Sequence, residues 1–438
     1  MNKKLVIKVD RTRILICLFC VVQKLLFEYI YVNIIYPAFR YYGFMNDFDM
    51  THCVISWFLY LPVLFFTIKA YEDETFSKMT VALILNITYT PCLILYEYYL
   101  STPFIMMLVV YYLVMMTASI MLNSVEFKIR KNQNTSFEKI ANIIGILFGL
   151  VVFFIWGFYT NFHLQLGFSD VYETRFTARE MDIPKVFFYL RTMARTITPV
   201  LAIYNLYKAR KWLFFYFAFV QFVQFCIDGT KSVVFTFAIG LIAYFFSDRN
   251  IHIVNNIPKF MSAGAALAII ENRFLNSSVI SNFFFRRVMF VPALLNYYYY
   301  DIAQQNGFDY YRQSIKLLGE SQYTHTIPQT VAGLYFKNGE VSASANNGVF
   351  ADAYVNLGFI GCLIMPFLVV LVFKLIEGAS AKLPKSIWIV SAIQFFYSFT
   401  ESSFFIVLLT HGALLVIVLL YLLTPNEDEY SSHRLDPA

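Results

Sequence analysis

Residues 103–122 read PFIMMLVVYYLVMMTASIML, a run of twenty residues without a charged side chain. A helix of about 20 apolar residues is long enough to cross the hydrocarbon core of a bilayer. Similar runs recur along the whole 438-residue chain, in which 59% of the residues are hydrophobic and only 14% are charged. Soluble domains carry roughly 25% charged residues, because their surface is hydrated. The sequence therefore excludes a soluble globular protein and predicts a polytopic integral membrane protein.

The apolar runs predict an all-α fold, a polytopic transmembrane helical bundle of about 12 spans. The expected spans are 14–36, 51–70, 78–100, 103–122, 140–160, 185–207, 212–228, 231–247, 258–275, 349–373, 386–400 and 403–423. Residues 1–270 hold the first nine spans with short loops, 271–348 form one long loop, 349–423 hold the last three spans, and 424–438 form a polar tail. In the long loop, residues 290–318 are expected to form amphipathic helices on the bilayer surface, interrupted at Asn306 and Gly307.

Basic residues predict the orientation of the chain, because they collect on the cytoplasmic side of a membrane. Those that precede the first span are Lys3, Lys4, Lys8, Arg11 and Arg13. An even number of spans then places both termini in the cytoplasm and the long loop on the outer, periplasmic side. No small-residue cleavage pattern follows the first apolar run, so we expect a retained span there and not a signal peptide.

The cysteines do not indicate a metal or redox site. All of them lie in apolar stretches, and Cys17 and Cys20 form a C-x-x-C pattern inside the first predicted span. In that setting two cysteines behave as small apolar residues. The sequence also lacks a paired cluster of metal-ligating residues. We therefore expect no metal and no other cofactor.

Five basic residues are candidates for binding an anionic group. Arg191 and Arg195 lie four residues apart, hence on one face of the span predicted over 185–207. An arginine at the centre of a membrane costs about 2.5–3.5 kcal/mol, so it normally faces a wet cavity. The alternative is that these side chains reach out to the interface, which Arg191 achieves more easily than Arg195.

The other three basic candidates lie at a turn and in the long loop. Lys231 belongs to the polar break DGTKS at 228–232, where a glycine and free amide groups suit an anion. The alternative is an ordinary turn between two helices. Arg286 and Arg287 together offer bidentate contacts to phosphate or carboxylate. Their alternative is attraction to anionic lipid headgroups.

Several polar residues are candidates for proton transfer or sugar binding. His325 is the single histidine in the sequence of the long loop. A neutral imidazole there could accept a proton from a sugar hydroxyl. The alternative is that it has no role, which is the more common case for a lone surface histidine. Asp352 is another candidate base, alongside Asp301, Asp309 and Glu320. Asn347, Asp352, Tyr354 and Asn356 lie at the start of the predicted span 349–373. Their polarity favours a cavity-lining face, and the glycines at 358 and 361 favour close helix packing.

The order of these features over residues 185–400 resembles the bacterial O-antigen polymerases, the Wzy-type oligosaccharide repeat-unit polymerases. The resemblance rests first on the GTKS turn at 229–232, where relatives typically carry a Gly-Ser-Arg-like turn. It also rests on Arg286 and Arg287, followed by Pro292 and the tyrosine run at 297–300. The last elements are PQTVAGLY at 328–335 and NGVFADAYVNLGFIG at 347–361.

The resemblance implies a membrane-embedded glycosyltransferase of the GT-C class at the periplasmic face of a bacterial inner membrane. Its substrates are oligosaccharide repeat units on undecaprenyl pyrophosphate, and neither a nucleotide sugar nor a nucleic acid is involved. Membrane lipids are further partners, and a chain-length regulator is a partner that the sequence does not test. The residues singled out above are then the candidate site residues, with His325 and Asp352 as candidate catalytic residues. The candidate substrate-binding residues are Arg191, Arg195, Lys231, Arg286, Arg287, Asn347 and Tyr354.

Three alternatives to a polymerase remain. The first is an O-antigen ligase, whose family is related and carries a His-Asn pair before its Gly-x-x-Gly pattern. This chain has Asn346-Asn347 at that place, so the histidine is absent. Its absence favours a polymerase and leaves the catalytic base unassigned. A lipid-linked oligosaccharide flippase also has about 12 spans, but it carries an internal repeat and short loops. The long loop argues against an unrelated secondary transporter.

Overall fold

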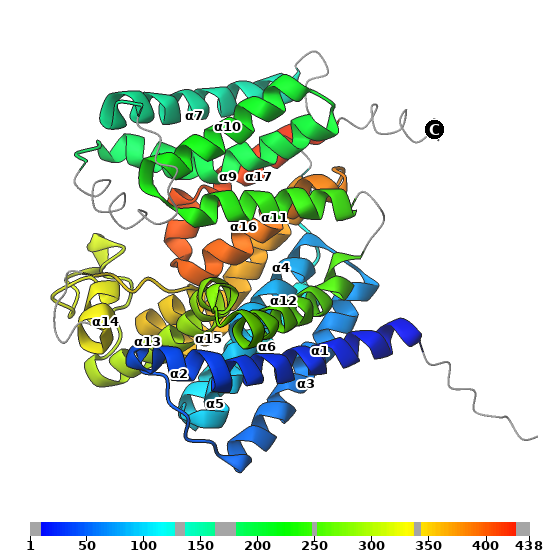
Figure 1. The fold of residues 1–438 in the computed structure, drawn as a ribbon. Coiled ribbons are helices and arrows are strands. Elements are labelled where there is room, and N and C mark those ends of the chain that lie inside the picture. Colours follow the sequence, from blue (N-terminus) through cyan, green and yellow to red (C-terminus); the bar gives the residue numbers. More distant parts are fainter. Residues whose placement is uncertain (1–9, 128–135, 163–180, 248–251, 337–342, 426–438) are drawn as a thin grey trace, which may run out of the picture. The chain divides into compact units, whose positions relative to one another are not determined.

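The computed structural model describes residues 10–127, 136–162, 181–247, 252–336 and 343–425. Every regular element within these ranges is a helix, which confirms the all-α prediction (Figure 1). The chain divides into two compact units. Unit 1 comprises residues 1–120 and 252–368, and unit 2 comprises residues 121–251 and 369–438. This division follows packing, whereas the predicted division into spans, long loop and tail concerns position in a membrane and stays a prediction.

Eight helical segments among the described residues are long and apolar enough to cross a membrane. They are Arg11–Tyr42, Met50–Glu72, Phe76–Tyr98, Thr102–Met121, Phe137–Thr160, Lys185–Tyr207, Ile253–Leu275 and Val349–Ala379. Each coincides with one predicted span. The other four predicted spans contain shorter helices, so the structure supports a multi-pass membrane protein with eight candidate spans, and a total of about 12 stays a prediction.

Unit 1 is built around a buried central segment. Its helices are α1 (Arg11–Ile30), α2 (Tyr36–Phe39), α3 (Met50–Glu72), α4 (Phe76–Ile84), α5 (Thr90–Tyr98), α6 (Thr102–Met121), α12 (Ile253–Leu275), α13 (Val291–Asn306), α14 (Ile327–Phe336) and the first part of α15 (Val349–Ala379). The π-helical turns η1 (Tyr31–Ile35), η3 (Leu85–Tyr89) and η4 (Ser281–Phe290) and the 3-10 turns η2 (Arg40–Tyr42) and η5 (Lys316–Leu318) connect them. Helix α1 packs on α12, and α3 packs on α5. Residues 76–98 are buried along their whole length, so they form the core.

Helix α13 differs from the amphipathic surface helix that we predicted. It ends at Asn306, and Gly307 after it has a φ of +84°, so the predicted interruption is present. However, Ala293 and Leu294 are completely buried, and the thiol of Cys92 in α5 faces the Ala293 carbonyl at 3.8 Å. A helix lying on the bilayer leaves one face unburied. Helix α13 packs into unit 1 instead, because its apolar residues cover most of its circumference.

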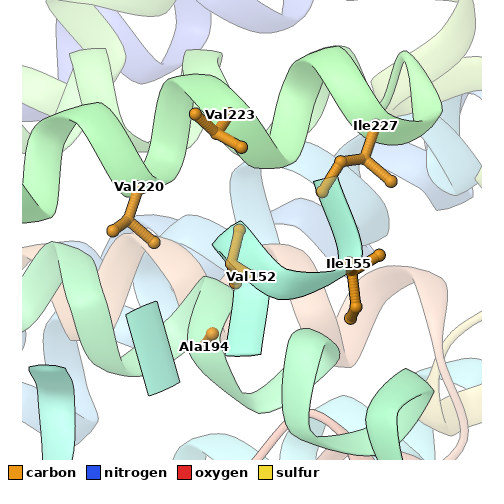
Figure 2. Packing of buried hydrophobic residues seen from close by; sticks show 6 residues of the cluster. All are labelled: Val152, Ile155, Ala194, Val220, Val223 and Ile227. Carbon is orange, nitrogen blue, oxygen red and sulfur yellow. The ribbon is translucent and has the colours of Figure 1, made fainter. Parts of the chain in front are cut away.

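Unit 2 is built around α9. Its helices are α7 (Phe137–Thr160), α9 (Lys185–Tyr207), α10 (Lys211–Asp228), α11 (Lys231–Ser247), the rest of α15, α16 (Lys385–Glu401), the π-helical turn η6 (Ile406–Thr410) and α17 (Ala413–Leu423). Helix α9 packs against α7, α10 and α16. Figure 2 shows the apolar cluster that α10 forms with α7 and α9. The cluster consists of Val152, Ile155, Ala194, Val220, Val223 and Ile227.

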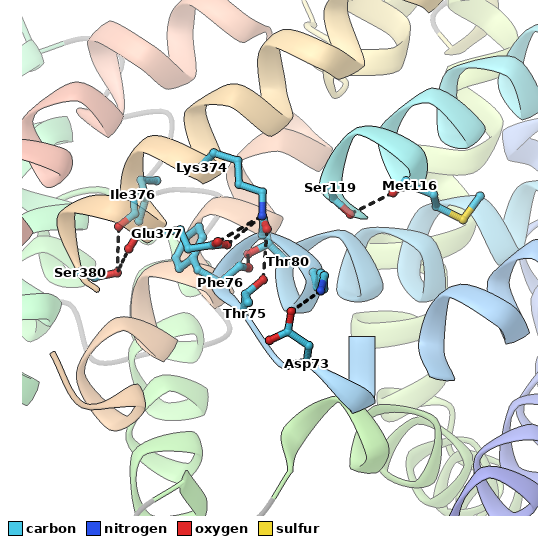
Figure 3. A network of polar contacts seen from close by, with 12 residues as sticks. Asp73, Thr75, Phe76, Thr80, Met116, Ser119, Lys374, Ile376, Glu377 and Ser380 are labelled. Carbon is cyan, nitrogen blue, oxygen red and sulfur yellow. Dashed lines mark hydrogen bonds and ion pairs between the residues drawn. The ribbon is translucent and has the colours of Figure 1, made fainter. Parts of the chain in front are cut away.

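Helix α15 runs six residues beyond the predicted end of its span at residue 373, and ends at Ala379. Lys374, the first residue after the predicted span, lies within the helix, and its Nζ binds Glu377 Oε1 at 3.1 Å (Figure 3). One turn later the Ser380 hydroxyl donates to the Ile376 carbonyl at 2.8 Å. A lysine paired with a glutamate three residues away is well accommodated in a helix, so the end of the apolar run was not the end of the helix.

Candidate functional site

The predicted site residues lie in two groups, one in each unit. Unit 1 holds Arg286, Arg287, His325, Asn347, Asp352 and Tyr354, and unit 2 holds Arg191, Arg195 and Lys231. The two groups are described in turn, each within its own unit.

A break in α15 shapes the group in unit 1. Gly358 has φ +57° and ψ −135°, so the helical hydrogen bonding stops there. The carbonyl groups of Val355 and Asn356 accept instead from the backbone N–H groups of Asp309 and Tyr310, each at 3.0 Å. The Asn356 side chain accepts from the Tyr311 N–H at 2.8 Å. The segment that follows α13 is therefore bound to the end of the first part of α15.

The same segment carries backbone strain next to Asp352. Tyr310 and Tyr311 have φ values of +56° and +60°, a conformation that bulky residues rarely adopt. Such strain persists only where the surrounding structure enforces it, and it clusters at functional sites. It turns the Tyr311 hydroxyl toward Asp352, to which the hydroxyl donates at 3.4 Å.

Asp352 is a buried carboxylate held by neutral donors. Its exposed fraction is 7%, and its Oδ1 accepts from Asn356 Nδ2 at 3.1 Å. Burial, and then the Asp352 charge, raise the pKa of the Tyr311 phenol well above its usual value. Tyr311 therefore stays protonated and donates to the carboxylate. Hydroxyl and amide donors also hold two other candidate bases of the sequence: Asp301 accepts from Tyr335 and Gln305, and Asp309 accepts from Ser321 and from the Gln313 N–H.

Asn347 and Tyr354 connect the start of α15 to α13. Asn347 Nδ2 donates to Asn296 Oδ1 at 2.8 Å, and the Tyr354 hydroxyl accepts from Gln304 Nε2 at 2.8 Å. The Tyr354 ring lies 4.8 Å from that of Tyr300. Both residues thus hold two elements together, and the Tyr354 ring is 5% exposed among its aromatic neighbours.

The structure separates Arg286 from Arg287. Arg286 is 6% exposed, its guanidinium stacks on Phe39 and Tyr42 with centroid distances of 4.5 and 4.9 Å, and its Nε donates to Asn282 Oδ1 at 2.7 Å. Cation–π contacts of this kind hold the side chain in place. Arg287 is exposed. The two adjacent guanidinium groups therefore do not share one environment.

His325 lies on the surface of unit 1. Its side chain is exposed, and its backbone carbonyl accepts from Gln313 Nε2 at 2.8 Å. Among the described residues, no hydrogen bond or ion pair joins its side chain to Asp352. The two residues proposed as catalytic from the sequence are therefore not brought together as a pair.

In unit 2, the two arginines of α9 lie where three helices meet. Arg191 is 5% exposed and Arg195 is partly buried. The Arg195 carbonyl accepts from Gln394 Nε2 of α16 at 3.1 Å and from Gln221 Nε2 of α10 at 3.5 Å. Amide side chains from two neighbouring helices thus reach the backbone of α9 at Arg195, and the wet cavity predicted beside the two arginines stays a prediction.

These amides have unused hydrogen-bonding capacity. Gln221, Gln224 and Gln394 are 1%, 0% and 4% exposed. Neither polar side-chain atom of Gln224 has a hydrogen-bond partner among the described residues, and the same holds for Oε1 of Gln221 and of Gln394. Buried polar groups nearly always have partners, and leaving one without costs free energy. Gln221 and Gln394, which donate to the Arg195 carbonyl, thus each keep an acceptor atom without a partner in the described ranges.

His411 is a residue that the sequence reasoning missed. The helix of the last predicted span is interrupted at His411 and Gly412, and Gly412 has a φ of +76°. The His411 carbonyl accepts from the Thr196 hydroxyl at 2.6 Å, and its imidazole is close enough to Arg195 to interact electrostatically. The sequence signal for this break is the pair of polar residues Thr410 and His411 followed by a glycine. We did not predict the break, because the apolar residues on both sides keep the average hydropathy of the span high.

Lys231 is the first residue of α11, directly after the turn that ends α10. Gly229 caps α10 with a φ of +63°. The turn therefore has the geometry of a helical hairpin, the alternative considered for it, and an anion-binding role for Lys231 stays a prediction. Within the described ranges, no group of three or more histidine, cysteine or acidic residues could hold a metal ion.

No family model, no curated protein and no solved structure matches the chain. The resemblance to the O-antigen polymerases therefore rests on the order of sequence features over residues 185–400.

Proposed function

We propose that the protein polymerises undecaprenyl-pyrophosphate-linked oligosaccharide repeat units into O-antigen or a related surface polysaccharide. It acts as a GT-C glycosyltransferase at the periplasmic face of a bacterial inner membrane, with both termini in the cytoplasm. The resemblance of residues 185–400 to the Wzy-type polymerases supports this, as does the multi-pass helical architecture.

One observation carries the proposal. Arg191 and Arg195 lie on one face of a membrane helix, Arg191 is almost completely buried, and Gln394 and Gln221 donate to the backbone carbonyl of Arg195. Arginines within a membrane span are typical of sites that bind an anionic group. A diphosphate that leaves during glycosyl transfer develops negative charge, and fixed guanidinium groups stabilise such charge in the transition state.

The reaction needs one further group, a base. A sugar hydroxyl of one repeat unit attacks the anomeric carbon of the growing chain, and the bond from that carbon to the diphosphate oxygen breaks. The electron pair of this bond leaves with the diphosphate, and the hydroxyl proton passes to the base. Asp352 fits this role better than His325, because it is buried and held by Tyr311 and Asn356.

Deletion of the gene in its host tests the proposal, with lipopolysaccharide analysed on a gel. Loss of the ladder with a single capped repeat retained is the expected result. Complete loss of the capped core would instead indicate a flippase or a ligase, and an unchanged ladder would reject all three functions.

A further inference from the structure

A short loop of unit 1, residues 309–321, exposes large apolar side chains. The two ends of this loop meet, because the hydroxyl of Ser321 donates to the carboxylate of Asp309. At its tip, Leu317 is 95% exposed and Leu318 is 51% exposed. Neighbouring apolar side chains on a surface mark a place where another molecule or a membrane makes contact. Compact loops with close ends are frequently functional.

The backbone of the 309–321 loop holds these leucines outward. The N–H of Ile315 donates to the Tyr311 carbonyl at 2.8 Å, and the N–H of Leu318 donates to the Ile315 carbonyl at 2.9 Å. Near the base, the Asp309 carboxylate accepts from the N–H of Gln313 at 2.9 Å. The exposure of the tip therefore follows from a turn that is closed by its own hydrogen bonds.

The base of the loop is bound to a candidate membrane span. The N–H groups of Asp309 and Tyr310 donate to the carbonyl groups of Val355 and Asn356, each at 3.0 Å. Both acceptors belong to the candidate span Val349–Ala379. An extended chain covers at most about 3.5 Å per residue, so the tip of such a short loop cannot move far from its base. Where this span crosses a membrane, the leucines therefore stay close to the bilayer.

Basic and aromatic side chains accompany the leucines. Lys316 is exposed and directly precedes Leu317, and the Arg312 guanidinium carbon lies 5.4 Å from the centroid of the Tyr310 ring. Tyr310 itself is 50% exposed. The exposed carboxylate of the loop is that of Glu320, so the basic side chains outnumber it. Leucines suit the edge of the hydrocarbon, a tyrosine suits the headgroup level, and long basic side chains reach anionic headgroups.

We propose that the 309–321 loop inserts Leu317 and Leu318 into the interface of a phospholipid bilayer, where Lys316 binds anionic headgroups. The sequence predicted a segment on the bilayer surface over residues 290–318. Since α13 packs into unit 1, that prediction narrows to this loop. The inference concerns contact with lipid, and it is independent of whether the protein is a polymerase.

A fluorescent probe on the tip tests the inference. The full-length protein with Leu317→Cys is labelled with an environment-sensitive maleimide and placed in nanodiscs of phosphatidylcholine, with or without phosphatidylglycerol. Quenching by a doxyl group on the lipid acyl chain is compared with quenching by iodide in the water. Thr324→Cys is the control, because Thr324 is exposed and lies just beyond the loop. Labelled wild-type protein gives the background from the native cysteines.

We expect doxyl lipid to quench the probe at position 317 about twofold or more and iodide to quench it weakly, with the reverse at position 324. Phosphatidylglycerol should increase the doxyl quenching, and adding Lys316→Gln to Leu317→Cys should remove that increase. The Tm in detergent should equal that of the wild type, since the side chain at position 317 is 95% exposed.

Equal iodide quenching at positions 317 and 324 would overturn the inference. A probe at position 317 that neither quencher reaches would overturn it as well, because protein and not lipid would then cover the tip. Identical doxyl quenching with and without phosphatidylglycerol would reject the binding of anionic headgroups by Lys316.

Discussion

The ring of Phe308 occupies the space in which a side chain at Gly358 would lie. A Cβ atom on Gly358 would come within 2.6 Å of Phe308 Cζ, and the backbone there has a φ of +57°. A Cβ atom on Gly361 would lie 2.1 Å from the Ala353 carbonyl oxygen. The Gly-x-x-Gly pattern, which the sequence suggested as a site of close packing between helices, thus serves the break within α15 itself. That break in turn exposes the carbonyl groups that bind the segment containing Tyr311.

Replacing Gly358 with alanine should destabilise unit 1. The backbone conformation is unfavourable for any residue with a Cβ atom, and the new methyl group meets an aromatic ring, so we expect a loss of about 3 kcal/mol. Gly264→Ala is the control, because nothing lies within 4 Å of a Cβ atom there and the residue is inside α12. That change should leave the stability unchanged or raise it by up to roughly 1 kcal/mol. Thermal unfolding in detergent measures both, and equal Tm values for the two variants would contradict the prediction.

The buried ion pair between Lys24 and Glu97 should be costly to break from one side. Both side chains have no exposed surface, and the Ser56 hydroxyl also donates to Glu97 at 2.6 Å. Lys24→Met leaves a buried carboxylate without its cation, so we expect a loss of about 3–5 kcal/mol. Removing both charges in Lys24→Met/Glu97→Gln should recover most of it.

Lys69→Met is the control for this pair, because Lys69 forms a surface ion pair with Glu72 and its loss should have little effect. The prediction fails if the double variant is as unstable as Lys24→Met in thermal unfolding.

Charge removal at Arg195 should abolish polymerisation without reducing the amount of protein. If Arg195 stabilises the leaving diphosphate, Arg195→Gln should lower the rate about 100-fold or more. Arg195→Lys should retain part of the activity, since lysine keeps the charge but loses the bidentate geometry. Arg273→Gln removes an exposed arginine from the last turn of α12 and should leave the ladder normal. An unchanged ladder with Arg195→Gln at normal protein levels would end the assignment.

Gln224→Leu should separate function from stability. The amide of Gln224 is buried and has no partner in the described ranges, so leucine should keep or raise the Tm. If the amide binds substrate beside α9, the ladder should nevertheless shorten or disappear. Gln23→Leu is a close match, because Gln23 in α1 is equally buried and equally without partners among the described residues. It should leave the ladder intact, and a parallel loss with both variants would show that the effect is not specific to α9.

Sequence reasoning located the helices well and their ends less well. Phe76–Tyr98 and Lys185–Tyr207 lie within two residues of their predicted spans, because hydropathy and local hydrogen bonding determine whether a segment is helical. The end of α15 and the break at His411 were missed, since a paired lysine and a polar turn hardly alter the average hydropathy of the surrounding residues.

The amino-acid sequence alone established an all-helical membrane protein and placed two arginines on one face of a helix, because both follow from composition and from spacing along the chain. The tertiary structure was needed to pair Tyr311 with Asp352 and to bring the His411 carbonyl to the Thr196 hydroxyl of α9. A tyrosine or glutamine in an apolar run looks the same whether it faces lipid or another helix. Which side chains meet depends on the packing of segments far apart in the chain, and no local pattern encodes it.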